Sequence, residues 1–83
     1  MHRENLKRAI IARVTLDAFI AQTDDDGIES AITDLVADLG HLCDLKKLNF
    51  QTLVARAINH WKDEQADPHS NKPRRIVGDK VAP

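Results

Sequence analysis

Four side chains that commonly bind divalent metal ions lie at helical spacing in this sequence. Asp38 and His41 are three residues apart, and His60 and Glu64 are four apart. Residues at these spacings share one face of an α-helix, and two helices that each offer a carboxylate and an imidazole can hold a metal between them. The sequence has no Glu-x-x-His pair of the kind that carboxylate-bridged bundles carry. A metal-dependent helical-bundle enzyme is therefore only a second alternative, and we predict no metal site and no cofactor.

Other reactive side chains have no catalytic setting in the sequence. Cys43 is the single cysteine, and it stands beside an apolar stripe, which favours the role of a small buried hydrophobe. Asp24, Asp25 and Asp26 form an acidic run typical of a solvated turn, and the alternating ligands of a calcium loop are absent. The three glycines stand apart, so no phosphate-binding loop is present. We predict no catalytic residues and no enzymatic activity.

Several polar side chains could instead read DNA. The pattern of helix, short turn and helix is shared with DNA-binding helix-turn-helix proteins, in which the last helix enters the major groove. The acidic character of the preceding helix opposes this interpretation, because DNA affinity comes largely from basic residues. A DNA-binding transcriptional regulator is thus our alternative, and its contact residues would be Gln51, Arg56 and Asn59 with Arg74 and Arg75 of the C-terminal tail.

The elements that position these residues are three predicted helices, over residues 5–22, 27–46 and 49–66. Asp26 with Glu29 three residues later is typical of an N-cap with a reciprocal partner, and Asn49 is a good N-cap for the third helix. We expect an all-α domain over residues 1–66. The segment 67–83 contains all three prolines and little apolar content, so we expect a flexible basic tail there.

The second predicted helix carries a heptad-like apolar seam. Spacings of three and four residues alternate along it, which places its members on one stripe. The third helix has its own apolar face, and only a few residues separate the two helices. We therefore predict that they pack as an antiparallel hairpin. The seam residues are Ile28, Ile32, Leu35, Leu39 and Leu42.

Apolar residues of the first helix spread over more than one side, so this helix needs more than one partner surface. A chain of 83 residues buries only roughly 60% of its unfolded surface, and oligomerisation is a usual remedy. We expect a homodimer, and Trp61 is an additional interface candidate because exposed aromatics often anchor interfaces. The predicted interface residues are Leu6, Ile10, Ile11, Val14, Phe19 and Trp61.

Charge is distributed unevenly along a chain whose net charge is −1. Residues 1–23 contain four basic and two acidic side chains, residues 24–66 four and nine, and residues 67–83 four and two. The acidic centre argues against nucleic acid as the partner of the helical domain. A lone cysteine and the lack of an apolar run of membrane-spanning length lead us to expect a cytoplasmic protein that binds no membrane.

The segment from Ala31 to Glu64 resembles a group of small helical proteins from bacteria and mobile elements. The shared features are an ITDLLADLxHLCD-like helix, a short Leu-Asp-Phe-like turn and an Ala-x-x-His-aromatic ending. They correspond here to residues 32–44, 48–50 and 57–61, with Gly40 where the group has Arg. The resemblance implies a helical hairpin and no activity. From the broad apolar surface of the first helix on so small a chain, we expect a small protein–protein interaction module that self-associates and binds an unidentified protein.

Overall fold

The computed structural model describes residues 3–66, within which the chain forms three α-helices and no strand. They are α1 (Arg3–Thr23), α2 (Ile28–Lys46) and α3 (Phe50–Ala66). The predicted all-α class is confirmed, and the predicted helix bounds differ from the observed ones by at most two residues. The tail predicted for residues 67–83, with Arg74 and Arg75, lies outside the described residues.

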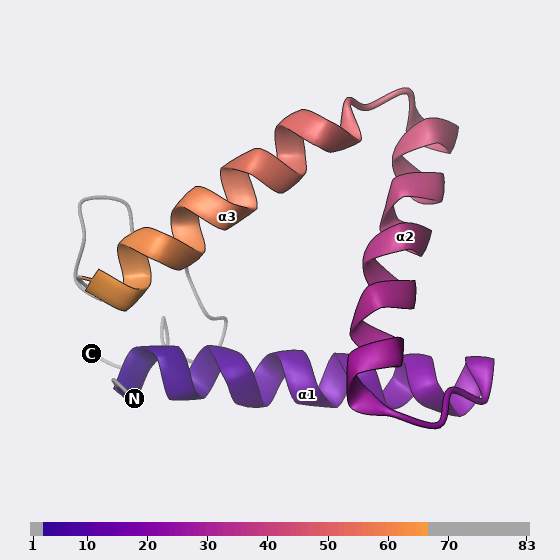
Figure 1. Ribbon diagram of the computed structural model, residues 1–83, viewed down its shortest axis with the longest axis horizontal. Helices are drawn as coiled ribbons and strands as arrows, with labels where there is room; N and C mark the ends of the chain where they lie inside the picture. Colours follow the sequence, from indigo (N-terminus) through magenta and orange to yellow (C-terminus); the bar gives the residue numbers. More distant parts are fainter. Residues whose placement is uncertain (1–2, 67–83) are drawn as a thin grey trace, which may run out of the picture.

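The three helices lie along the sides of an open triangle (Figure 1). The first turns of α2 lie beside the C-terminal half of α1, and α3 runs back toward the N-terminus of α1. A hydrogen bond closes the triangle: Nδ2 of Asn5 donates to the backbone carbonyl oxygen of Glu64 at 2.9 Å. The helices of the described region meet at the corners of this triangle and do not pack along their lengths, so the frame is open (Figure 1).

The antiparallel hairpin predicted for the second and third helices is not confirmed. α2 and α3 meet at their connecting turn and diverge beyond it, so they do not run alongside each other (Figure 1). Gly40 allows the close contact near the turn. A Cβ at this position would lie 3.0 Å from Cε2 and 3.1 Å from Cδ2 of the Phe50 ring. The ring therefore occupies the space that a side chain at residue 40 would need.

The turn between α2 and α3 is a Schellman motif. Lys47 adopts the left-handed conformation with φ 60°, its N–H donates to the carbonyl of Asp44, and the N–H of Leu48 donates to the carbonyl of Cys43 at 2.8 Å. A non-glycine residue is strained there by roughly 1 kcal/mol. The predicted N-cap of the third helix is confirmed, because Oδ1 of Asn49 accepts from the backbone N–H of Thr52 at 3.1 Å.

The turn between α1 and α2 differs in one detail from the prediction. Asp24 has φ 59° and its N–H donates to the carbonyl of Ile20 at 2.9 Å, which closes the last turn of α1. The N-cap of α2 is Gly27 rather than Asp26, and its backbone is extended. The prediction of Asp26 as the cap is therefore wrong by one residue. The neighbouring Asp25 accepts the side-chain hydrogen bonds of this turn instead.

The buried part of the described residues is small. α1 contributes Leu16, which is 6% exposed, and α2 contributes Ala31 and Cys43. Glu64 of α3 is the buried charged residue in this region. No large side chain of residues 3–66 is completely buried. Three helices thus form a frame with two packed corners and one hydrogen-bonded junction, and most of their apolar surface lies outside a core.

Candidate interaction surface

A stripe of large aliphatic side chains runs along the exposed side of α1. Leu6, Ile10 and Val14 are spaced by four residues, which places them on one side of the helix. Val14 is 67% exposed, and the other two are at least half exposed. The stripe lies about 120° around the helix from the buried Leu16, at 100° per residue. We call these three residues the α1 stripe. With Leu16 buried on one side and the stripe exposed on another, α1 has apolar residues on more than one side, as the sequence predicted.

The other predicted interface residues are distributed over two helices. Ile11 is exposed on α1 beside the stripe, whereas Phe19 is only partly exposed and lies on another side of the helix. Trp61 is 57% exposed near the C-terminal end of α3. The structure therefore brings Leu6, Ile10 and Val14 together and places Trp61 on a separate element.

The predicted seam of α2 is largely uncovered. Ile28, Ile32, Leu39 and Leu42 are all roughly half exposed, and only Leu35 is partly covered. The reason is the divergence of α3, which meets α2 at Gly40 and Phe50 and leaves the seam without a helix along its length. A heptad-like seam normally lies against another helix. We call Ile28, Ile32, Leu39 and Leu42 the α2 seam.

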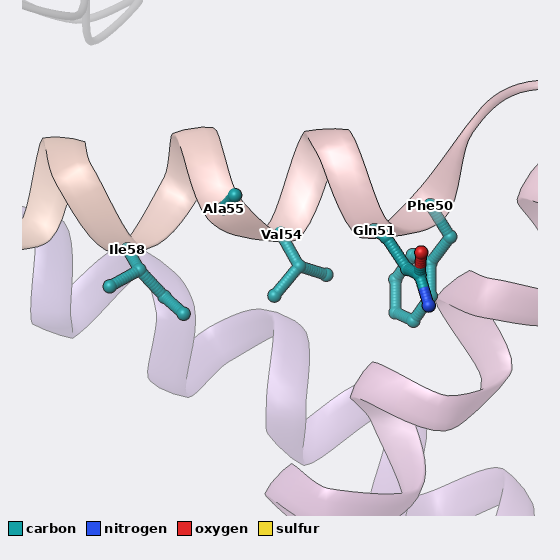
Figure 2. Close-up of a pocket in the computed structure, with 5 residues that line it drawn as sticks. All are labelled: Phe50, Gln51, Val54, Ala55 and Ile58. Carbon is teal, nitrogen blue, oxygen red and sulfur yellow. The ribbon is translucent and has the colours of Figure 1, made fainter.

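α3 carries a shallow apolar depression of about 280 Å³. Figure 2 shows Phe50, Val54 and Ile58 projecting from the side of α3 that faces α1 and α2. Gln51 lies at the end of the depression beside the Phe50 ring, and Ala55 points the other way. Phe50 and Val54 are partly buried, and Ile58 is exposed. The interior edge of the triangle is therefore lined by apolar side chains, of which Phe50 packs against Gly40 of α2 and Ile58 stays exposed.

A pair of carboxyl groups lies at the turn between α1 and α2. Asp25 accepts hydrogen bonds from the hydroxyls of Thr23 at 3.0 Å and Ser30 at 3.1 Å, and these lower the pKa of its carboxyl. Asp34 lies beside it, and the hydrogen bond with Asp25 and the negative charge of Asp25 raise the pKa of the Asp34 carboxyl. The turn therefore stabilises the negative charge of Asp25 and disfavours ionisation of Asp34.

This pair predicts opposite effects of two isosteric substitutions. Because the pKa of Asp34 is raised on folding, its contribution to stability is complete below about pH 3.8 and is lost as the pH rises through its folded pKa. Asp34→Asn should therefore raise the melting temperature at pH 7, with no gain near pH 3. The pKa of Asp25 is lowered, so its contribution is present above about pH 3.8 and is lost as the pH falls through its folded pKa. Asp25→Asn should lower the melting temperature at pH 7. Equal melting temperatures for the two variants at pH 7 would contradict this assignment.

The residues considered for metal binding or catalysis do not form a site in the structure. Among residues 3–66, no group of three or more His, Cys, Asp or Glu side chains is placed to hold a metal ion. Asp38 and His41 are exposed on α2, whereas His60 is partly buried and Glu64 buried on α3. Cys43 is buried, as its position beside the seam indicated.

The residues considered for DNA contact are only partly gathered. Arg56 and Asn59 are exposed on α3, and Gln51 lines the apolar depression. Arg74 and Arg75 fall outside the described residues. Among the proposed DNA contacts, Arg56 is therefore the one basic side chain that lies within residues 3–66.

Three features of the surface escaped sequence reasoning. The sequence gives no signal for the Asn5–Glu64 hydrogen bond, which joins residues at opposite ends of the described chain. The Asp25–Asp34 pair could have been suspected, since the turn places an acidic run before a helix whose first turns carry Ser30 and Asp34. The depression on α3 follows from the divergence of α2 and α3, which helical periodicity cannot indicate.

No family model matches the chain, and no curated protein or solved structure shows significant similarity to it. Within the described residues, no helix combines the length and the apolar character that crossing a membrane requires. Any statement about function must therefore come from the surface itself.

Proposed function

We propose that this protein is a small interaction module that forms a homodimer and binds a further protein. The observation that supports the proposal is the exposure of large apolar side chains on all three helices. Within residues 3–66, the buried apolar side chains are only those of Leu16, Ala31 and Cys43. The largest apolar patch of a typical monomer covers about 300–600 Å² and often marks an interaction site. Here large apolar side chains are exposed on each of the three helices.

The α1 stripe is the surface that we assign to self-association, together with Ile11 beside it. Its side chains are aliphatic, closely spaced and already exposed, so a partner can cover them without rearrangement of the frame. Burial contributes roughly 25 cal/mol per Å² of apolar surface. Trp61 and the depression on α3 remain for a second protein, because Trp61 is exposed three residues along α3 from Ile58 of the depression, and an exposed Trp is often an interface anchor.

Light scattering of the full chain over a range of concentrations tests the dimer. We expect twice the chain mass at high micromolar concentration and a shift toward the monomer on dilution. Val14→Asp should shift the equilibrium toward the monomer without loss of helicity, because Val14 is largely exposed within its own chain. A wild-type chain that stays monomeric at several hundred micromolar, with its helices intact, would contradict the proposal.

The fluorescence of Trp61 can be followed in the same concentration series, because Trp61 is the only Trp in the chain. Its fluorescence reports whether the end of α3 is covered when the chain associates. We expect little change in emission on dimerisation, because Trp61 belongs to the surface for the second protein. A marked blue shift with concentration would move Trp61 into the homodimer interface.

DNA binding is the alternative function. It is favoured by the short turn between α2 and α3, whose three residues connect diverging helices as in helix-turn-helix proteins. It is opposed by α2, whose charged side chains are four acidic and one basic. Fluorescence anisotropy with mixed-sequence duplex DNA at low salt tests it, and Arg56→Ala should weaken any binding that uses α3.

A further inference from the structure

We propose that the homodimer is formed by reciprocal pairing, in which the α1 stripe of each copy lies against the α2 seam of the other. This inference rests on the proposed self-association and specifies the surfaces that it uses. Two copies related by a twofold axis would then make the same contact twice, as a closed symmetric dimer requires. Each copy would cover the seam that α3 leaves open in its partner.

The charges of the two helices are complementary. α1 contains four basic and two acidic side chains, whereas α2 contains one basic and four acidic. The charges also border the apolar surfaces: Lys7 and Arg13 are each three residues from Ile10 of the stripe. On α2, Glu29 is three residues from Ile32 and Asp38 is four from Leu42. Apart from Asp17, which is three residues from Val14, a basic border therefore faces an acidic one when α1 of one copy meets α2 of the other.

Pairing of like helices would bring like charges together. Two copies of α2 side by side would join two surfaces with an excess of three negative charges each, and two copies of α1 would join two positively charged surfaces. Juxtaposition of like charges disfavours an interface, and complementary charges select partner and register. The ion pairs Lys7–Glu4 and Arg13–Asp17 within α1 leave its excess of two positive charges in place, and exposed pairs at these spacings are weak.

The exposed apolar area fits an interface of ordinary size. Leu6, Ile10 and Val14 on one side and Ile32, Leu39 and Leu42 on the other are each about half exposed or more. With Ile28 and Ile11, eight large aliphatic side chains of each copy are exposed, and a standard interface takes about 800 Å² of total surface from each partner. The charged borders would supply the polar rim of such an interface.

Two single substitutions in the full chain test the pairing. Ile10→Asp damages the stripe and leaves the seam intact, and Ile32→Asp does the opposite. In reciprocal pairing, each variant alone loses both contacts, so its homodimer should weaken at least tenfold. A mixed dimer of the two variants keeps one undamaged contact, between the α1 stripe of the Ile32→Asp chain and the α2 seam of the Ile10→Asp chain. Mixing should therefore restore association.

The measurement combines light scattering with native mass spectrometry, in which one variant carries ¹⁵N so that mixed dimers are recognised by mass. We expect the mixed dimer to be at least tenfold more stable than either variant homodimer. Leu45→Asp is the matched control, because Leu45 is 76% exposed on α2 outside the seam, and it should associate within about twofold of the wild type. Circular dichroism verifies that all variants keep their helices.

Each contrary outcome has a separate meaning. Two monomeric variants that form no mixed dimer would overturn reciprocal pairing, while the wild-type dimer would still support the proposed function. Loss of the dimer in only one variant would indicate pairing of like helices and would also overturn the inference. Two variants that dimerise like the wild type would move the interface to α3 and overturn it as well. A monomeric wild-type chain would contradict the proposed function itself.

Discussion

Leu16→Ala should remove most of the stability of the helical frame, at a cost of about 2–4 kcal/mol in the free energy of unfolding. Leu16 is the largest buried aliphatic side chain among residues 3–66, and the other buried apolar residues, Ala31 and Cys43, are small. A domain of this size rarely has more than about 3–5 kcal/mol from a single core. Loss of one buried leucine is therefore comparable to the total.

Urea titration followed by circular dichroism measures this effect, at a protein concentration low enough to keep the chain monomeric. Leu45→Ala is the matched control, since it removes the same atoms from a position that is 76% exposed, and it should cost less than about 0.5 kcal/mol. If the two substitutions cost the same, Leu16 does not carry the packing of the frame, and the small core described above is not what stabilises it.

The effect of Gly40→Ala on the free energy of unfolding should depend on whether the Phe50 side chain is present. In an open helix, alanine is favoured over glycine by about 1 kcal/mol. At residue 40 the added Cβ would lie 3.0 Å from the Phe50 ring, so the ring must move away from α2 and the gain is lost. After Phe50→Ala, the same Gly40→Ala change should stabilise the chain by about 1 kcal/mol. We expect Phe50→Ala alone to cost about 2 kcal/mol, below the range for a full core position because the ring is only partly buried.

A double-mutant cycle of thermal or urea unfolding measures the coupling between the two positions. Gly27→Ala provides a glycine control, because its φ of −157° suits any residue and nothing lies within 4 Å of an added Cβ. Its effect should not depend on Phe50. If Gly40→Ala stabilises the chain equally with and without the Phe50 side chain, then the ring does not pack on Gly40 in solution.

The helices of this protein could be predicted from the sequence because their determinants are local. The cap at Asn49, the breaks around Gly27 and Lys47, and the apolar periodicity of α2 all act within a few residues. The prediction of Asp26 as N-cap failed by one position, because the cap is the extended Gly27, which makes no side-chain cap bond, and Asp25 accepts the side-chain bonds of the turn.

The arrangement of the helices could not be predicted in the same way. A seam such as Ile28 to Leu42 indicates that something should cover it, but it does not indicate whether that is α3 or a second chain. The direction of α3 depends on the left-handed Lys47 and on the packing of Phe50 against Gly40. Neither the backbone conformation of Lys47 nor the contact of the Phe50 ring with Gly40 can be inferred from residue types alone. The candidate surface shows the same difference. The residues of the α1 stripe could be named from their spacing in one helix, whereas the depression on α3 depends on how the helices are arranged.

The hydrogen bond from Asn5 to the carbonyl of Glu64 has a consequence for how the frame opens. It joins positions 59 residues apart, so ordering this junction carries the entropy cost of closing a long loop. We expect an opening of the α1–α3 junction to let α3 swing about the turn at residues 47–49 while α1 and α2 stay together. Amide protons near residues 60–66 should then exchange with solvent through a partial opening, at a lower free energy than those of α2 around Cys43. The protein would thus behave as a stable pair of helices, α1 and α2, from which α3 detaches and returns in a local opening reaction.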